Sequence, residues 1–175
     1  MSALIPNANA NANLIIPRIW LGNRAAAADE AFIRDVGINV IINASKNIPF
    51  LDSEFGNTLH KYRVPVDDNL EESEIANMSK WAPEITYYLL NEYKAGNTIL
   101  VHCAAGMQRS AAIVAMALIV IKNIRAEDAM KYVKAQRRIA FFPSANFKRS
   151  ILEFERHYMS IRRGGVAATA TSTTI

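Results

Sequence analysis

The sequence predicts a single α/β domain in which helices flank a central, mostly parallel, twisted sheet. Short apolar or β-branched segments recur near residues 15, 38, 58 and 98, and helical patterns separate or follow them. The chain has 175 residues, of which 51% are hydrophobic and 21% charged, as is typical of one globular domain. No internal repeat is visible, so we assign residues 14–162 to that domain, between an N-terminal arm of residues 1–13 and a C-terminal tail of residues 163–175.

The two ends of the chain have compositions that favour disorder. The first 13 residues are rich in Ala and Asn, the last residues are rich in Ala and Thr, and neither end has a periodic apolar face to bury. We therefore expect a flexible arm and a disordered tail. The arm leaves open a homodimer formed through the N-terminal segments.

The first half of the domain reads as strands interrupted by one helix. The β-branched run that ends at Asn43 is short and apolar, as a buried strand should be. Gly37 stands where a helix would stop, after an Ala-rich segment with one apolar side. From these patterns we expect one strand around Pro17 that ends at Gly22, a helix over residues 24–36, and strands within residues 38–43 and 58–66.

Helical patterns dominate the second half of the domain. The acidic residues at 71, 72 and 74 favour the start of a separate short helix, because negative charge stabilises a helix N-terminus. A longer helix should not begin much before Ser79, since Pro83 is tolerated only near a first turn. We expect helices over residues 79–93, 110–122 and 126–138, and a final helix that Ser144 caps.

The chain is organised around one stretch, in which an apolar segment delivers Cys103 into a short loop and Arg109 opens the next helix. Loop amides between a strand end and a helix N-terminus carry partial positive charge and can hold a tetrahedral anion. Ligands of open α/β sheets bind at such strand ends. The same field lowers the pKa of a thiol, so the order of these elements favours phosphate chemistry.

Four neighbours of Cys103 have candidate roles in phosphate chemistry, and an ordinary structural role is open to them as well. The planar guanidinium of Arg109 can bind two equatorial phosphoryl oxygens, and its charge at a helix start is otherwise unfavourable. Gly106 lets the loop turn tightly. Ser110 either donates its hydroxyl to the sulfur or is an ordinary helix-start residue. His102 is badly placed as a base, because adjacent strand residues point to opposite faces; it supports the loop by a hydrogen bond or is a core histidine.

Phosphoryl transfer to sulfur also needs an acid that protonates the departing oxygen. Asp67 and Asp68 are the candidates, because they end a predicted strand at a turn. On its own, the same pair reads as two turn-forming aspartates. The residue types alone do not choose between the two carboxylates.

Composition argues against several other classes of protein. Cys103 is the only cysteine, which excludes a disulfide framework within the chain and a multi-thiolate zinc site, and we expect no metal or cofactor. The longest apolar run, residues 111–121, is too short to cross a bilayer and no signal peptide is visible, so we expect a cytoplasmic protein without membrane contact. The net charge of +4 mildly favours anionic partners.

The loop resembles a known signature. Residues 102–110 read His-Cys-Ala-Ala-Gly-Met-Gln-Arg-Ser, which resembles the His-Cys-x5-Arg-Ser/Thr motif of the protein tyrosine phosphatase superfamily. From about residue 15 to residue 155 the chain resembles the small atypical dual-specificity phosphatases, including the compact poxvirus-type enzymes. The resemblance implies a cysteine-dependent phosphatase that acts on phosphotyrosine and phosphoserine or phosphothreonine of protein substrates through a phosphocysteine intermediate.

The resemblance also implies site residues. Cys103 would be the nucleophile, Ser110 would assist hydrolysis of the phosphocysteine, and the acid would be the aspartate directly before Asn69, hence Asp68. The phosphate cradle would be Arg109 with the backbone amides of Ala104, Ala105, Gly106, Met107 and Gln108. One departure stands out: the family usually shows Pro-Asn-x-x-Phe where residues 143–147 read Pro-Ser-Ala-Asn-Phe, so a polar contact that supports the site is expected to be rearranged.

Three alternative functions have weaker support in the sequence. An RNA 5′-triphosphatase would be expected to show a basic and aromatic pattern for RNA, and none stands out. Phosphoinositide phosphatases with this signature tend to carry lysines in the loop, where this chain has Ala, Ala, Met and Gln. A non-catalytic phosphate-binding module usually lacks the nucleophile, and Cys103 is intact.

Overall fold

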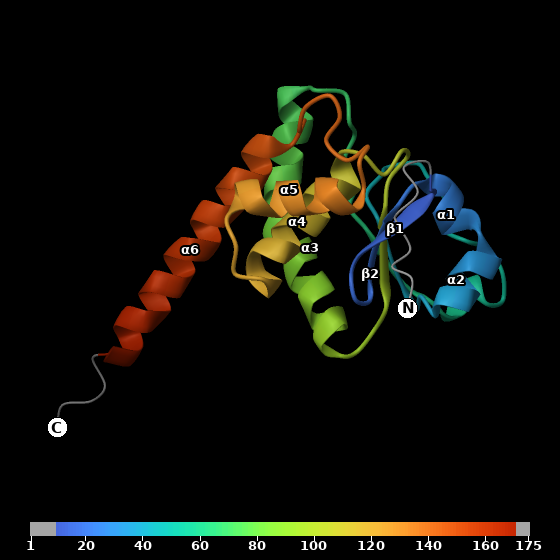
Figure 1. Ribbon diagram of the computed structural model, residues 1–175, viewed down its shortest axis with the longest axis horizontal. Helices are drawn as coiled ribbons and strands as arrows, with labels where there is room; N and C mark the ends of the chain where they lie inside the picture. The colour runs from blue at the N-terminus through green and yellow to red at the C-terminus, as the bar shows by residue number, and fades with distance from the viewer. Residues whose placement is uncertain (1–9, 171–175) are drawn as a thin grey trace.

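A computed structural model describes residues 10–170 and has helices on both faces of a five-stranded sheet (Figure 1). The strand order is β1-β2-β5-β3-β4; β1 is antiparallel to β2, and the other pairs are parallel. The predicted α/β class is confirmed. The strands are β1 Ala12–Ile16, β2 Ile19–Gly22, β3 Val40–Asn43, β4 His60–Arg63 and β5 Ile99–His102. The helices are α1 Arg24–Ala28, α2 Glu30–Val36, α3 Glu72–Lys94, α4 Arg109–Ile121, α5 Ala126–Gln136 and α6 Lys148–Ala170.

The two faces of the sheet bury different helices, because successive strand residues point to opposite sides. Leu100 of β5 packs with Ala26 and Ile33 in the smaller core under α1 and α2. Its neighbours Ile99 and Val101 belong to the larger core, which α3, α4, α5 and α6 cover. Helix α4 lies inside this larger core with residues 110–119 buried, as its apolar sequence predicts.

The parallel strands end at a common edge. Gly22 of β2 and Asn43 of β3 both pair with His102, the last residue of β5. The next residue, Cys103, therefore leaves the sheet at its carboxyl edge, between two flanking strands. This is the place where open α/β sheets bind ligands.

Two expectations for the first half of the domain were too simple. The segment around Pro17 forms a hairpin of two strands, β1 and β2, that turns at residues 17–18. The predicted helix over residues 24–36 is broken at Asp29, whose side chain accepts a hydrogen bond from the N–H of Phe32 and caps α2. Side-chain capping at Asp29 competes with continuation of α1, which is why the Ala-rich pattern did not reveal the break.

Helix α3 begins earlier than predicted. It runs without interruption from Glu72 to Lys94, with Pro83 in its middle. Met78 and Ile85, which lie on either side of the proline, are fully buried in the main core. Packing of this face offsets the one hydrogen bond that proline removes, so the proline does not mark the helix start.

The ends of the described chain also differ from expectation. Ala12 and Asn13, assigned to the arm, already belong to β1, and Asn13 is buried. Helix α6 continues through residues 163–170, which were assigned to the tail, and the alanines at the end of this segment favour a helix. Ser144 does not begin this helix, which starts at Lys148. Residues 1–9 of the predicted arm and residues 171–175 of the predicted tail lie outside the described residues. None of the described helices combines the length and the apolar character needed to cross a membrane.

Candidate active site

The loop between β5 and α4 has its carbonyl groups turned outward. The carbonyl of Ala104 accepts from the N–H of Arg24 at 3.2 Å, and that of Met107 from the N–H of Phe141 at 2.8 Å. The carbonyls of Ala105 and Gly106 accept from one arginine side chain, described below. Because donors outside the loop occupy these four carbonyls, the N–H groups of the loop are left to face a ligand above Cys103.

Cys103 lies at the base of this loop and is buried with 2% of its surface exposed. Burial by itself raises the pKa of the thiol. The hydroxyl of Ser110, whose Oγ lies 3.1 Å from Sγ, and the backbone N–H of Ser110 lower the pKa, as do the charge of Arg109 and the backbone of Gly106. These contributions outweigh burial, so the pKa of Cys103 lies below its ordinary value and the thiolate is favoured.

Gly106 is needed for the path of the loop. Its φ is 66°, in the left-handed region, and an added Cβ would lie 2.4 Å from the carbonyl oxygen of Gly22. No other residue fits here without moving the end of β2. The predicted reason for this glycine, a tight turn, is thus joined by a second one, the close approach of another strand.

Arg109 connects the cysteine loop with the segment that carries the two aspartates. Its Nη1 donates to the carbonyl of Val66 at 3.0 Å, and its Nε is buried without a hydrogen-bond partner among the described residues. A buried guanidinium N–H without a partner is costly, and a phosphoryl oxygen would satisfy it. Val66 precedes Asp67 and Asp68, so this contact brings both halves of the predicted site together.

The two aspartates have different surroundings. Asp67 forms an ion pair with Lys46 at 3.0 Å, and its N–H donates to the carboxylate of Glu74, which also pairs with Lys46. Asp68 forms none of these contacts; its Oδ1 accepts a hydrogen bond from Nδ2 of Asn146 at 2.8 Å. Asp67 is therefore held in an ion cluster with Lys46 and Glu74, whereas Asp68 lies outside that cluster.

His102 is fully buried behind the loop. Burial lowers its pKa to about 4; the charges of Arg63 and Arg109 act in the same direction, and the backbone of Cys103 partly offsets them. The imidazole is therefore neutral. Neither ring nitrogen has a hydrogen-bond partner of good geometry among the described residues, so the supporting role of His102 stays a prediction.

Sequence reasoning missed Arg137, which holds the cysteine loop from outside. Arg137 is buried, with 1% of the residue exposed, and its guanidinium donates to the carbonyl of Gly106 at 2.8 Å and to that of Ala105 at 3.2 Å. It also donates to the carbonyl of Ala10 at 2.9 Å and to Oδ1 of Asn13 at 2.7 Å. The available signal was an Arg-Arg pair at the end of an amphipathic helix, which by itself reads as a solvated helix terminus.

The candidate site combines a thiol, a guanidinium and a carboxylate. Within residues 10–170, no three His, Cys, Asp or Glu side chains gather as a metal site would require. The arrangement can hold a phosphoryl group against a thiolate, with a carboxylate on an adjoining segment.

Comparisons with known proteins agree with this geometry. A profile of the dual specificity phosphatase catalytic domain matches residues 19–157. The chain belongs to the dual specificity phosphatase family. Dual specificity protein phosphatase 4 of Homo sapiens is 31% identical over 155 residues, which are 89% of this chain and 37% of that protein. Dual specificity protein phosphatase 1 of Homo sapiens is 30% identical over 146 residues, which are 83% of this chain and 38% of that protein.

Solved structures have the same fold. DUSP15 superposes with a TM-score of 0.75 at 25% identity, covering 89% of this chain and 95% of the other. Human DUSP28 superposes with a TM-score of 0.75 at 24% identity, covering 86% of this chain and 98% of the other, a likeness of fold. The chain spans under two fifths of the length of the first two relatives, so it matches one part of them.

Proposed function

We propose that this dual specificity phosphatase domain hydrolyses phosphotyrosine and phosphoserine or phosphothreonine in proteins through a phosphocysteine intermediate. The observation that carries the proposal is the hydrogen bond from Arg109 to the carbonyl of Val66. It brings the carboxylate segment to the cysteine loop, although the two are separated by 43 positions in the chain. A thiolate, a cation and an acid at one strand edge are what phosphoryl transfer to sulfur needs.

The first step forms a phosphorus–sulfur bond. The Cys103 thiolate attacks phosphorus, the bond from phosphorus to the substrate oxygen breaks, and Asp68 gives its proton to that oxygen. Arg109 and the N–H groups of the loop stabilise the charge on the three remaining phosphoryl oxygens. The products are the dephosphorylated hydroxyl side chain and phosphocysteine.

The second step reverses the roles of the same groups. The Asp68 carboxylate takes a proton from water, the water oxygen attacks phosphorus, and the phosphorus–sulfur bond breaks to release inorganic phosphate. The hydroxyl of Ser110 donates a hydrogen bond to the departing sulfur, which leaves as a thiolate. The 3.1 Å contact between Oγ and Sγ supports this role for Ser110.

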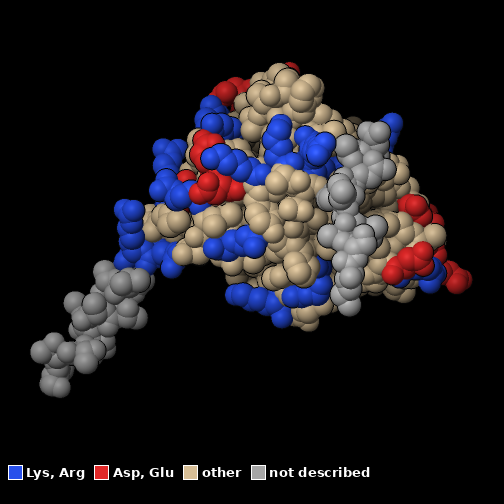
Figure 2. All heavy atoms as spheres, in the orientation of Figure 1, with Lys and Arg blue, Asp and Glu red and all other residues tan. Residues whose placement is uncertain are grey.

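The surface charge is consistent with an anionic substrate. The net charge is +4, and Lys and Arg side chains gather over α5 and α6 on the face seen in Figure 2, with fewer acidic side chains between them. The charge itself does not distinguish a phosphoprotein from RNA. The class of substrate is therefore decided by comparing rates.

The test measures initial rates on phosphotyrosine and phosphothreonine peptides, triphosphate-ended RNA and a phosphoinositide. We expect the peptides to be the best substrates and Cys103→Ser to abolish turnover of all of them. Asp68→Ala should slow turnover about 100-fold or more, the usual size of general acid catalysis, and Asp67→Ala by much less. RNA turned over as fast as the peptides, or peptide binding without any turnover, would contradict the proposal.

A further inference from the structure

The loop between α5 and α6 is fastened to the phosphate-binding loop. The side chain of Gln108 is 4% exposed, and its Nε2 donates to the carbonyl of Phe142 at 3.1 Å and to that of Ser144 at 2.9 Å. Its Oε1 accepts from the N–H of Asn146 at 3.0 Å. The N–H of Phe141 donates to the carbonyl of Met107 at 2.8 Å. The side chain of Gln108 therefore holds this loop, and only the backbone N–H of Gln108 is left to bind a phosphate.

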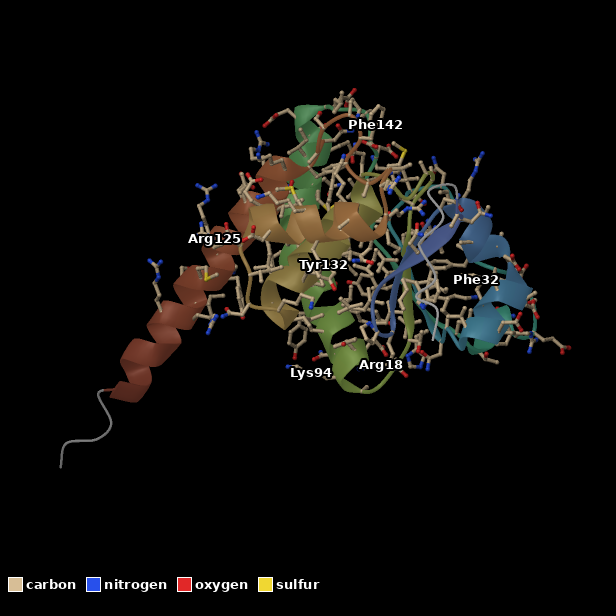
Figure 3. The ribbon with its side chains drawn as sticks, in the orientation of Figure 1. Arg18, Phe32, Lys94, Arg125, Tyr132 and Phe142 are labelled. Carbon is tan, nitrogen blue, oxygen red and sulfur yellow. The ribbon has the colours of Figure 1, made fainter. Side chains whose placement is uncertain are left out.

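The fastened loop presents one amide to the acid. The Asn146 side chain donates from Nδ2 to Oδ1 of Asp68 at 2.8 Å, and no other side chain among residues 10–164 hydrogen-bonds that carboxylate. Phe142, labelled in Figure 3, marks the position of this loop. Asp68 itself is exposed on a turn without regular secondary structure. Its orientation thus depends on a contact with a residue 78 positions away in the sequence.

We propose that Asn146 is the positioning residue of the acid Asp68 and that Gln108 holds Asn146 in place. The inference rests on the proposed function. It couples the phosphate-binding loop to the acid through a chain of contacts: Gln108 fixes the backbone of residues 142–146, and the Asn146 side chain fixes Asp68. The asparagine of the family's usual Pro-Asn-x-x-Phe motif would stand at position 144, where this chain has serine, and Asn146 lies two positions later.

The chemistry explains why one N–H donor matters. An N–H bonded to Oδ1 leaves Oδ2 as the oxygen that carries the transferable proton, and it fixes the direction in which that proton points. When the proton leaves, negative charge develops on the carboxylate, and a hydrogen bond to an ionised acceptor is stronger than one to a neutral group. Asn146 therefore favours the proton transfer itself. The resulting gain in rate is largest for basic leaving groups, whose oxygen must be protonated to depart.

The structural alternative is that Asn146 only anchors the loop before α6. The two roles differ in their dependence on the substrate. A loss of loop order would lower activity on every phosphate ester and weaken phosphate binding. A loss of acid positioning would lower kcat/KM, which reports the first step, for basic leaving groups and leave it almost unchanged for acidic ones, which depart without a proton.

The experiment compares the full chain with Asn146→Ala on aryl phosphates of graded phenol acidity and on a phosphothreonine peptide. We expect kcat/KM, which reports the steps up to departure of the leaving group, to fall roughly 10- to 100-fold on the peptide and on the most basic phenol, out of the 10²- to 10⁴-fold that a general acid supplies. On the most acidic phenol kcat/KM should change less than about 3-fold, and inhibition by inorganic phosphate should not change. Ser144→Ala is the matched control, since only the backbone carbonyl of Ser144 contacts Gln108.

Two further variants complete the test. Introducing Asn146→Ala into Asp68→Ala should cause no additional loss, because a positioning residue acts only through the acid it positions. Gln108→Glu keeps the acceptor for the Asn146 N–H but removes the two donated bonds. Its new negative charge in the phosphate-binding loop weakens binding of every phosphate ester, so the quantity compared is the ratio of kcat/KM between the most basic and the most acidic phenol, and this ratio should fall as it does in Asn146→Ala. A uniform loss over all phenols, an additive loss in the double variant, or full activity of Asn146→Ala would overturn the inference. Failure of the proposed function appears elsewhere, as turnover by Cys103→Ser or none by the unmodified chain.

Discussion

Replacing Arg137 with lysine should loosen the phosphate-binding loop although the positive charge is kept. The guanidinium forms four hydrogen bonds, two to the loop carbonyls of Ala105 and Gly106 and two to Ala10 and Asn13 near the start of β1. An ammonium is a point donor and lacks the fork that reaches acceptors on two segments at once. We therefore expect Arg137→Lys to lose two of the four bonds.

The size of the effect follows from the burial of this side chain. Arg137 is 1% exposed, so water cannot replace the lost donors. A hydrogen bond from a charged donor contributes about 1.5–3 kcal/mol, and two such bonds give a loss of about 3 kcal/mol at the lower limit. For a chain of this size, that corresponds to a fall in Tm of roughly 6–12 °C.

Urea unfolding measures the loss of stability, and competition by inorganic phosphate measures the state of the loop. We expect phosphate to inhibit the variant about 10-fold less strongly, because freed carbonyls let the loop amides turn away from the ligand. Arg138→Lys is the control: this neighbour is exposed, and surface substitutions usually change stability by less than about 0.5 kcal/mol. A change below about 1 kcal/mol for Arg137→Lys, with unaltered phosphate inhibition, would refute the reasoning.

Two further substitutions test the loop and its thiolate. Gly106→Ala should abolish phosphate binding and lower Tm strongly, because φ is 66° and the new Cβ would lie 2.4 Å from the Gly22 carbonyl oxygen. The control Gly96→Ala has φ at 91° with nothing within 4 Å, and should cost about 1–3 kcal/mol of backbone strain without affecting phosphate binding; equal binding by both variants would contradict this. Ser110→Ala should raise the pKa of Cys103, since it removes a donor to the thiolate. The ratio of thiolate to thiol at a given pH below that pKa should fall about 10-fold or more, so alkylation by iodoacetamide should begin at higher pH; an unchanged pH profile would show that the contact does not stabilise the thiolate.

The elements that sequence patterns predicted best are those whose burial is uniform. Helix α4 is apolar on nearly all sides, and β3 is a short β-branched run; in both, the pattern and the burial agree. The patterns were misleading where a single residue is compatible with two structures. The local preference of Pro83 predicts a nearby helix start, but the residue lies inside α3 because tertiary packing outweighs that preference.

The residues of the candidate site also differ in how far the sequence predicts their arrangement. Cys103, Arg109 and Ser110 lie within eight consecutive positions, and the strand and helix on either side determine their arrangement. The distinction between Asp67 and Asp68 came from family resemblance, and the structure adds a physical reason for it. Lys46 pairs with the carboxylate of Asp67, and Glu74 accepts a hydrogen bond from its N–H. No pattern in the sequence indicates these contacts.

By itself, the sequence determined the α/β class and predicted the phosphate-binding stretch of residues 102–110, because strand, loop and helix follow one another without a break. It limited the candidate acid to Asp67 and Asp68, and family resemblance selected Asp68. Only the tertiary structure decided what holds that stretch in place. Arg137 acts from 31 positions beyond Gly106, and Asn146 from 78 beyond Asp68. A hydrogen bond requires its two atoms to lie within about 3 Å, and residue type and spacing cannot supply that proximity across separate elements.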